Sequence, residues 1–74
     1  MYLIKTFDLE VSCKDLNELK EKLGGMNGQS VSIQYPVTQG EIDNLFVHIM
    51  EDGTVVETYN RQKTVDLNNL HLWE

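Results

Sequence analysis

The segment from residue 44 to residue 60 constrains the fold of this chain more than any other part of the sequence. Residues 44–50 and 54–60 have the alternating character of strands, and Asp52-Gly53 lies between them. Asp-Gly favours a two-residue type I′ turn, because both central positions of that turn need a positive φ. The turn therefore predicts a hairpin and fixes its register. The predicted cross-strand pairs include Met50 with Val55, Ile49 with Val56, and His48 with Glu57.

Both faces of this predicted hairpin are apolar, but the sequence pattern predicts only one helix that could cover them. One face carries Val47, Ile49 and Val56, and the other carries Phe46, Met50, Val55 and Tyr59. The helix begins after Ser12 as its N-cap, with Asp15 in the first turn, and the glycines at 24–25 end it through a left-handed conformation. Its single apolar stripe consists of Leu16, Leu19 and Leu23.

One helix covers one face of a sheet, so the second face of the hairpin needs another cover. Two explanations remain open from the sequence. Either the C-terminal segment folds back over this face, or another protein chain docks there. The apolar residues available in the C-terminal segment are Leu67, Leu70, Leu72 and Trp73.

Residues 2–11 and 30–37 complete the predicted sheet. Pro36 cannot donate to a strand ladder, which places the second of these segments at a sheet edge or near a strand end. Residues 64–73 form a short element that is either a strand or a helix capped by Asp66. We therefore predict one α+β domain over residues 1–74. It is a small single-layer antiparallel sheet in β-α-β-β-β order, with one helix packed on one face and a short C-terminal element.

Charge and cysteine content exclude several classes of function. The 74 residues carry a net charge of −6, which disfavours phosphate backbones and anionic lipid surfaces. We expect no direct contact with nucleic acid or membrane. Cys13 is the single cysteine, so no internal disulfide forms, and the two histidines show no metal-ligand spacing. The lone thiol and the absence of a signal-like apolar run predict a cytoplasmic protein.

The same segment that predicts the hairpin also carries the candidate binding residues. Residues 41–60 contain five acids and no lysine or arginine, which favours a protein partner with a basic surface. The acids are Glu41, Asp43, Glu51, Asp52 and Glu57. The apolar residues Phe46, Met50, Val55 and Tyr59 are candidates for the same partner contact or for the seam of a homo-oligomer.

No catalytic constellation emerges from the sequence. His48 beside Glu57 has the chemistry of a general base, but the sequence places no nucleophile near them. Cys13 lies in the predicted first helical turn and is read as a small buried residue. The glycines at 24–28 follow a helix, whereas a phosphate-binding loop precedes one. We predict a non-enzymatic protein without cofactor or metal.

Residues 17–35, NELKEKLGGMNGQSVSIQY, resemble the corresponding part of the YonK-like phage proteins over about a quarter of the chain. The small acidic single-domain format is also similar to that of anti-CRISPR and other anti-defence proteins. The resemblance implies a phage-type inhibitor or adaptor acting in the host cytoplasm. It would bind a basic, nucleic-acid-handling host protein through the acidic and aromatic hairpin surface. The alternative is a homo-oligomeric structural or assembly module that uses the second apolar face.

Overall fold

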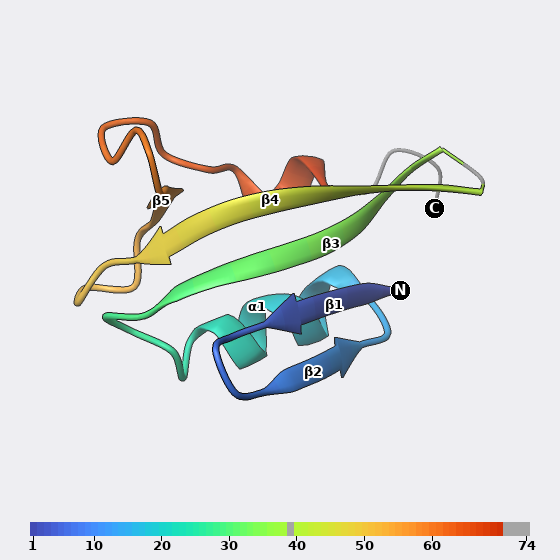
Figure 1. Ribbon diagram of the computed structural model, residues 1–74, viewed down its shortest axis with the longest axis horizontal. Helices are drawn as coiled ribbons and strands as arrows, with labels where there is room; N and C mark the ends of the chain where they lie inside the picture. Colours follow the sequence, from blue (N-terminus) through green and yellow to red (C-terminus); the bar gives the residue numbers. More distant parts are fainter. Residues whose placement is uncertain (39, 71–74) are drawn as a thin grey trace.

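Five antiparallel strands form one sheet in the order β2-β1-β3-β4-β5, with one α-helix and one 3₁₀ helix (Figure 1). The computed structural model of the chain describes residues 1–38 and 40–70. The elements are β1 Tyr2–Lys5, β2 Glu10–Cys13, α1 Leu16–Leu23, β3 Ser30–Thr38, β4 Glu41–Ile49, β5 Val55–Glu57 and η1 Leu67–Asn69. The α+β class with an antiparallel sheet and one α-helix is confirmed, although the element order begins with two strands.

The predicted first strand is a hairpin of two short strands. The Thr6 amide donates to the Leu9 carbonyl over 2.8 Å, and the Thr6 hydroxyl donates to Asp8 over 3.4 Å. These bonds close a tight turn with Phe7 at its tip. β1 thereby lies between β2 and β3 and pairs antiparallel with both. The turn contains no glycine, proline or asparagine, and Asp8 is its only residue of a type that is common in turns.

The helix α1 begins at a different cap from the one predicted. Its N-cap is Asp15, whose carboxylate accepts from the Glu18 amide over 2.9 Å. Ser12 instead belongs to β2, where it pairs with Leu3. The helix ends at Gly24 with a φ of −62°, so the predicted left-handed ending is also wrong. The predicted apolar stripe is confirmed, with Leu19 and Leu23 buried and Leu16 half-buried against the core.

β3 is the central strand and makes the most extensive pairing of the sheet with β4. Pro36 lies near its end, beyond Gln34, which is the last residue of β3 that pairs with β1. Of the two positions predicted for the proline, the strand end is therefore the observed one. The register shifts between Pro36 and Thr38, and Gly40 has a φ of 88° where the chain turns into β4.

The β4–β5 hairpin is one residue out of the predicted register. The Gly53 amide donates to the Met50 carbonyl over 2.9 Å, and the Met50 amide donates to the Thr54 carbonyl over 2.8 Å. Gly53 has a φ of 91°, as in a three-residue loop that combines a type I turn with a left-handed residue. The observed pairs are Ile49 with Val55, His48 with Val56, and Val47 with Glu57.

This slip moves every side chain of β5 to the opposite face from the predicted one. Val55 lies in the core beside Ile49, so it does not share a face with Phe46. His48 and Glu57 are not cross-strand neighbours, and the predicted pair is wrong. The physical reason is that the loop has one residue more than predicted. A glycine at position 53 suits both the predicted and the observed loop type.

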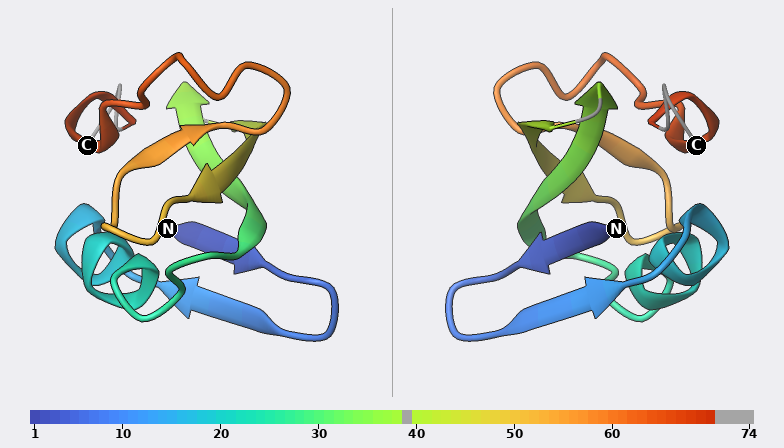
Figure 2. Two further views of the ribbon diagram at one scale, coloured as in Figure 1. Left: turned by 90° about the vertical axis from the view of Figure 1, so that its left-hand side faces the viewer. Right: turned by 90° about the vertical axis from the view of Figure 1, so that its right-hand side faces the viewer.

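The C-terminal segment covers the same sheet face as α1. After β5 the chain runs along the outer edge of that strand, where the Val65 amide donates to the Val55 carbonyl over 2.8 Å. It then enters η1, whose N-cap Asp66 accepts from the Asn68 amide over 3.0 Å. Figure 2 shows α1 and η1 on one side of the sheet. The Lys20 ammonium joins the two elements by donating to the Asn68 side chain.

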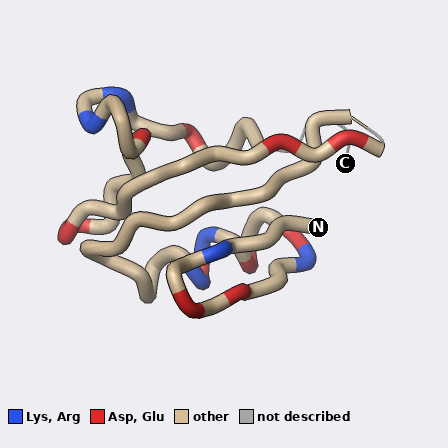
Figure 3. Tube along the Cα trace, in the orientation of Figure 1, with Lys and Arg blue, Asp and Glu red and all other residues tan. Residues whose placement is uncertain are grey.

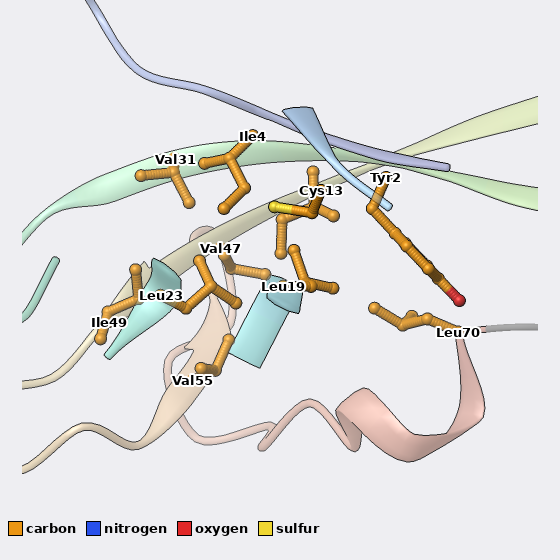
Figure 4. Packing of buried hydrophobic residues seen from close by; sticks show 11 residues of the cluster. Tyr2, Ile4, Cys13, Leu19, Leu23, Val31, Val47, Ile49, Val55 and Leu70 are labelled. Carbon is orange, nitrogen blue, oxygen red and sulfur yellow. The ribbon is translucent and has the colours of Figure 1, made fainter. Parts of the chain in front are cut away.

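The core fills the space between this side of the sheet, α1 and η1. Leu70 is buried in one cluster with Tyr2, Leu19 and residues of all five strands (Figure 4). Of the two explanations left open by the sequence, cover of the second face by the C-terminal segment is therefore wrong for Leu67 and Leu70. Leu72 and Trp73 lie outside the described residues. Within the described part of the chain, neither helix has the length and apolar character needed to cross a membrane.

Candidate functional site

The outer face of the sheet, opposite α1 and η1, carries no covering element among residues 1–38 and 40–70 (Figure 2). Strand alternation places polar side chains along its centre, because the apolar residues of β3 point into the core. Ser30, Ser32 and Gln34 follow one another on this face. An aromatic residue, Phe46, lies directly across from Ser32 on β4.

A groove of about 500 Å³ crosses this outer face. One wall comes from the β1–β2 hairpin and the other from the segment that follows β5. The residues that line it are Lys5, Thr6, Ser30, Val31, Ser32, Phe46, Thr58 and Tyr59. Phe46 is 56% exposed and Tyr59 is 82% exposed, so two aromatic rings stand in solvent at this groove. We call these eight residues the outer-face groove.

Lys5 supplies the only positive charge among the residues of the outer-face groove. Its ammonium makes no ion pair or hydrogen bond with the described residues. Glu10 lies opposite it on β2 by register, without forming an ion pair. The groove therefore combines aromatic rings, hydroxyl groups and one available cation.

Ser30 and His48 form a hydrogen-bonded pair at the edge of the groove. The Ser30 hydroxyl lies 2.9 Å from Nδ1 of His48, and the two residues face each other across β3 and β4. Nucleophilic catalysis would also need a group that orients the imidazole. Within the described residues, no carboxylate makes a hydrogen bond or an ion pair with the His48 ring. We interpret the pair as a cross-strand contact.

The five candidate acids do not form one surface. Glu41 and Asp43 begin β4, whereas Glu51 and Asp52 lie in the loop after its other end, and Figure 3 shows the two pairs at opposite ends of the molecule. Glu57 is separate from both, with a side chain only 12% exposed, 3.5 Å from the Lys63 ammonium. The predicted acidic surface is thus divided into three places.

Two of these acids are already engaged by their own surroundings. The Asp52 carboxylate accepts from the Thr54 amide over 2.9 Å, and this hydrogen bond lowers the pKa of Asp52. Asp43 faces Tyr35 across the β3–β4 ladder. Burial raises the pKa of the Tyr35 phenol above its usual 10.0, and the charge and hydrogen-bonding of Asp43 raise it further.

The apolar candidates also separate. Phe46 and Tyr59 share the outer-face groove, Met50 is partly exposed where β4 ends, and Val55 is buried in the core. Sequence reasoning missed the contribution of the first hairpin, because Lys5 and Thr6 reach the groove only through strand order. It also missed Phe7, which is fully exposed at the hairpin tip and carries no signal in the pattern.

Comparisons with protein-family models, with curated proteins and with solved structures gave no match for this chain. The functional argument therefore rests on the geometry alone. Cys13 is buried, and burial raises the pKa of its thiol, which is the opposite of what a reactive thiol requires. The described residues contain no group of three or more His, Cys, Asp or Glu arranged to hold a metal ion.

We predict that Asp43→Asn lowers the pKa of Tyr35, because it removes the neighbouring negative charge. A folded-state pKa above the unfolded one means that this group stabilises the fold below pH 10.0. That stabilisation is lost as the pH rises through the folded-state pKa. An NMR titration of the Tyr35 ring measures the shift. Asp52→Asn is the control, since Asp52 lies at the other end of β4, and an equal shift from it would contradict the assignment.

Proposed function

We propose that this chain is a non-enzymatic binding protein that holds a partner protein against the outer face of its sheet. The observation that carries the proposal is the outer-face groove, where Phe46 and Tyr59 stand exposed on a face that no described element covers. Aromatic residues are enriched at the centres of protein interfaces, where truncating one of them commonly costs a large share of the binding energy. The hydroxyl groups and Lys5 supply polar contacts around these two rings.

The partner that we propose has a basic surface. The chain has a net charge of −6, and its two acidic pairs lie at the opposite ends of β4, beyond the groove. Charges at such rim positions steer association more than they fix final affinity. The narrower proposal, an inhibitor or adaptor of a nucleic-acid-handling host protein, follows the small acidic single-domain format, which is similar to that of anti-CRISPR and other anti-defence proteins. Such proteins present basic surfaces because they bind phosphate backbones.

The aromatic part of the proposal is tested by capture of host proteins with the double variant Phe46→Ser/Tyr59→Ser. We expect at least about a tenfold loss of the captured partner, because two central aromatic contacts disappear. Ile42→Ser is the matched control, since Ile42 is also exposed but lies outside the outer-face groove. Capture that is unchanged in the double variant would contradict the proposed site.

The charge part of the proposal is tested separately, because the structure divides the acids. Glu51→Lys/Asp52→Lys and Glu41→Lys/Asp43→Lys are each expected to slow association and to weaken its dependence on salt. Glu57 is left intact, since its reversal would also break the contact with Lys63. Association rates at several salt concentrations measure the effect. A partner whose binding depends on the groove but on neither acidic pair would restrict the proposal to the aromatic contact.

The alternative is an assembly module in which a second copy occupies the same face. Its seam would use Phe46, Met50 and Tyr59, without the buried Val55. Light scattering on the purified chain and on its Phe46→Ser/Tyr59→Ser variant together separates the two candidates. An oligomer that dissociates in the Phe46→Ser/Tyr59→Ser variant would favour the assembly module over the capture of a partner.

A further inference from the structure

The two edges of the sheet differ in how they are protected. At the β5 edge, residues 63–65 run alongside the strand, and the Glu57 amide donates to the Lys63 carbonyl over 3.1 Å. At the other edge, β2 pairs with β1 on one side and has no strand on its outer side within the described part of the chain, and it forms the lower boundary of the molecule in Figure 1. An open edge presents backbone groups that pair readily with another strand.

The hairpin geometry identifies which backbone groups of β2 are open. The bond from the Thr6 amide to the Leu9 carbonyl closes the β1–β2 hairpin. Bonded and non-bonded pairs alternate along an antiparallel ladder, so every second residue of β2, counted from Leu9, bonds to β1. The residues between them, Glu10 and Ser12, therefore direct their N–H and C=O groups toward solvent.

The charged side chains along this edge, Glu10 and Lys14, can face their opposites on the same edge of a second chain. Lys14 follows β2 directly, at a bend in the chain, and the next residue, Asp15, has the extended angles φ −148° and ψ 177°. Two copies related by a twofold axis through Ser12 place Glu10 of each copy opposite Lys14 of the other. Neither Glu10 nor Lys14 forms an ion pair or a side-chain hydrogen bond with the described residues. Opposite charges that face each other across strands stabilise the pairing.

Other registers are less favourable. Outward-facing residues must pair with outward-facing residues, so the register can change only in steps of two residues. A shift toward the hairpin tip places Lys14 opposite Asp8, which lies in the turn and cannot continue the ladder. The axis through Ser12 is therefore the one that pairs Glu10, within β2, with the residue that directly follows β2.

We propose that two copies of this chain pair antiparallel through β2 to form one continuous ten-stranded sheet. The twofold axis passes between the Ser12 residues of the two copies. The axis is perpendicular to the sheet, so both α1 helices lie on one side and both outer-face grooves remain open on the other. The pairing also sets Val11 of each copy opposite Cys13 of the other, and it brings Leu9, which is 55% exposed, toward the seam. This inference goes beyond the proposed function, because it uses neither Phe46 nor Tyr59.

The test uses two charge reversals on the full chain, measured by sedimentation equilibrium. Glu10→Lys makes the edge wholly basic, and Lys14→Glu makes it wholly acidic. We expect the unaltered chain to form dimers as its concentration rises. Each variant alone should have a dimerisation affinity at least about tenfold lower. An equimolar mixture of the two variants is expected to form a heterodimer, because the two lysines on the edge of one chain then face two glutamates on the edge of the other. Thermal melts confirm that each variant is folded.

Two controls make the outcome specific to the β2 edge. Glu21→Lys and Lys22→Glu change the same charges on the exposed surface of α1 and should leave the dimer unchanged. Ser12→Pro removes an outward N–H without breaking a bond to β1, and it should abolish the dimer. A chain that is monomeric at every concentration overturns the proposal, as does a dimer that survives Ser12→Pro or two variants that fail to associate when mixed. Dimerisation that persists in Phe46→Ser/Tyr59→Ser separates this interface from the proposed function.

Discussion

Leu19→Ala is expected to remove about 2–5 kcal/mol from the free energy of unfolding, because it leaves a cavity where a fully buried side chain was. Leu19 and Leu23 are the buried residues of α1, the only α-helix among the described residues. A domain of 74 residues has a total stability of roughly 4–11 kcal/mol. The variant should therefore lose a large fraction of its stability, which urea unfolding followed by circular dichroism measures.

Leu16→Ala is the matched control for this prediction. Leu16 belongs to the same apolar stripe and the same helix, but it is only half-buried, so its truncation should cost less than half as much. The two substitutions change helix propensity equally, because both replace leucine with alanine. Equal losses from the two variants would show that α1 does not pack through Leu19 as the structure describes.

The helix itself was predictable, because its leucine spacing is a local signal, whereas its cap was not. Ser12 and Asp15 are both good N-cap residues, and the sequence alone does not decide between them. The decision comes from β2, which incorporates Ser12 into a ladder with β1. That strand was not predicted either, because Asp8 is the only residue at positions 6–9 of a type that usually marks a turn.

The register of the β4–β5 hairpin could not be predicted because two valines follow each other in β5. Val55 and Val56 are both suited to a core position, so the apolar pattern fits either register. Asp52-Gly53 is compatible with a two-residue loop and with a three-residue loop, because both need glycine at position 53. One extra loop residue then decides that Val55 enters the core and that Val56 faces His48.

The candidate site was predictable only where it is local. Phe46 and Tyr59 were identified from the hairpin pattern, and both line the outer-face groove. Lys5 and Thr6 reach it because β1 pairs with β3, which is a long-range choice that periodicity cannot reveal. The prediction of one acidic surface was wrong for the opposite reason. The acids are close in the sequence, but Glu41 and Asp43 begin the nine-residue strand β4, whereas Glu51 and Asp52 follow its other end.

Leu70→Ala is expected to cost about 2–5 kcal/mol, because Leu70 is buried in the core cluster that contains Tyr2 and Leu19. The sequence left open whether the C-terminal segment, which includes Leu70, or another protein chain covers the second sheet face. In the structure it closes the inner face beside α1, held there by the η1 cap and by the contact between Lys20 and Asn68. Its loss should therefore loosen the packing around Tyr2, which urea unfolding and near-UV circular dichroism both measure.

Leu67→Ala separates this role of Leu70 from a general effect on η1. Leu67 is the first residue of η1 and is only half-buried, so its truncation should cost clearly less than that of Leu70. Chemical shifts of Phe46 on the outer face should change in neither variant, because that ring lies on the opposite side of the sheet. A Leu70→Ala variant that keeps its stability but perturbs Phe46 would place the C-terminal segment on the outer face. The groove would then be covered by the chain itself, and the reason to expect a partner there would disappear.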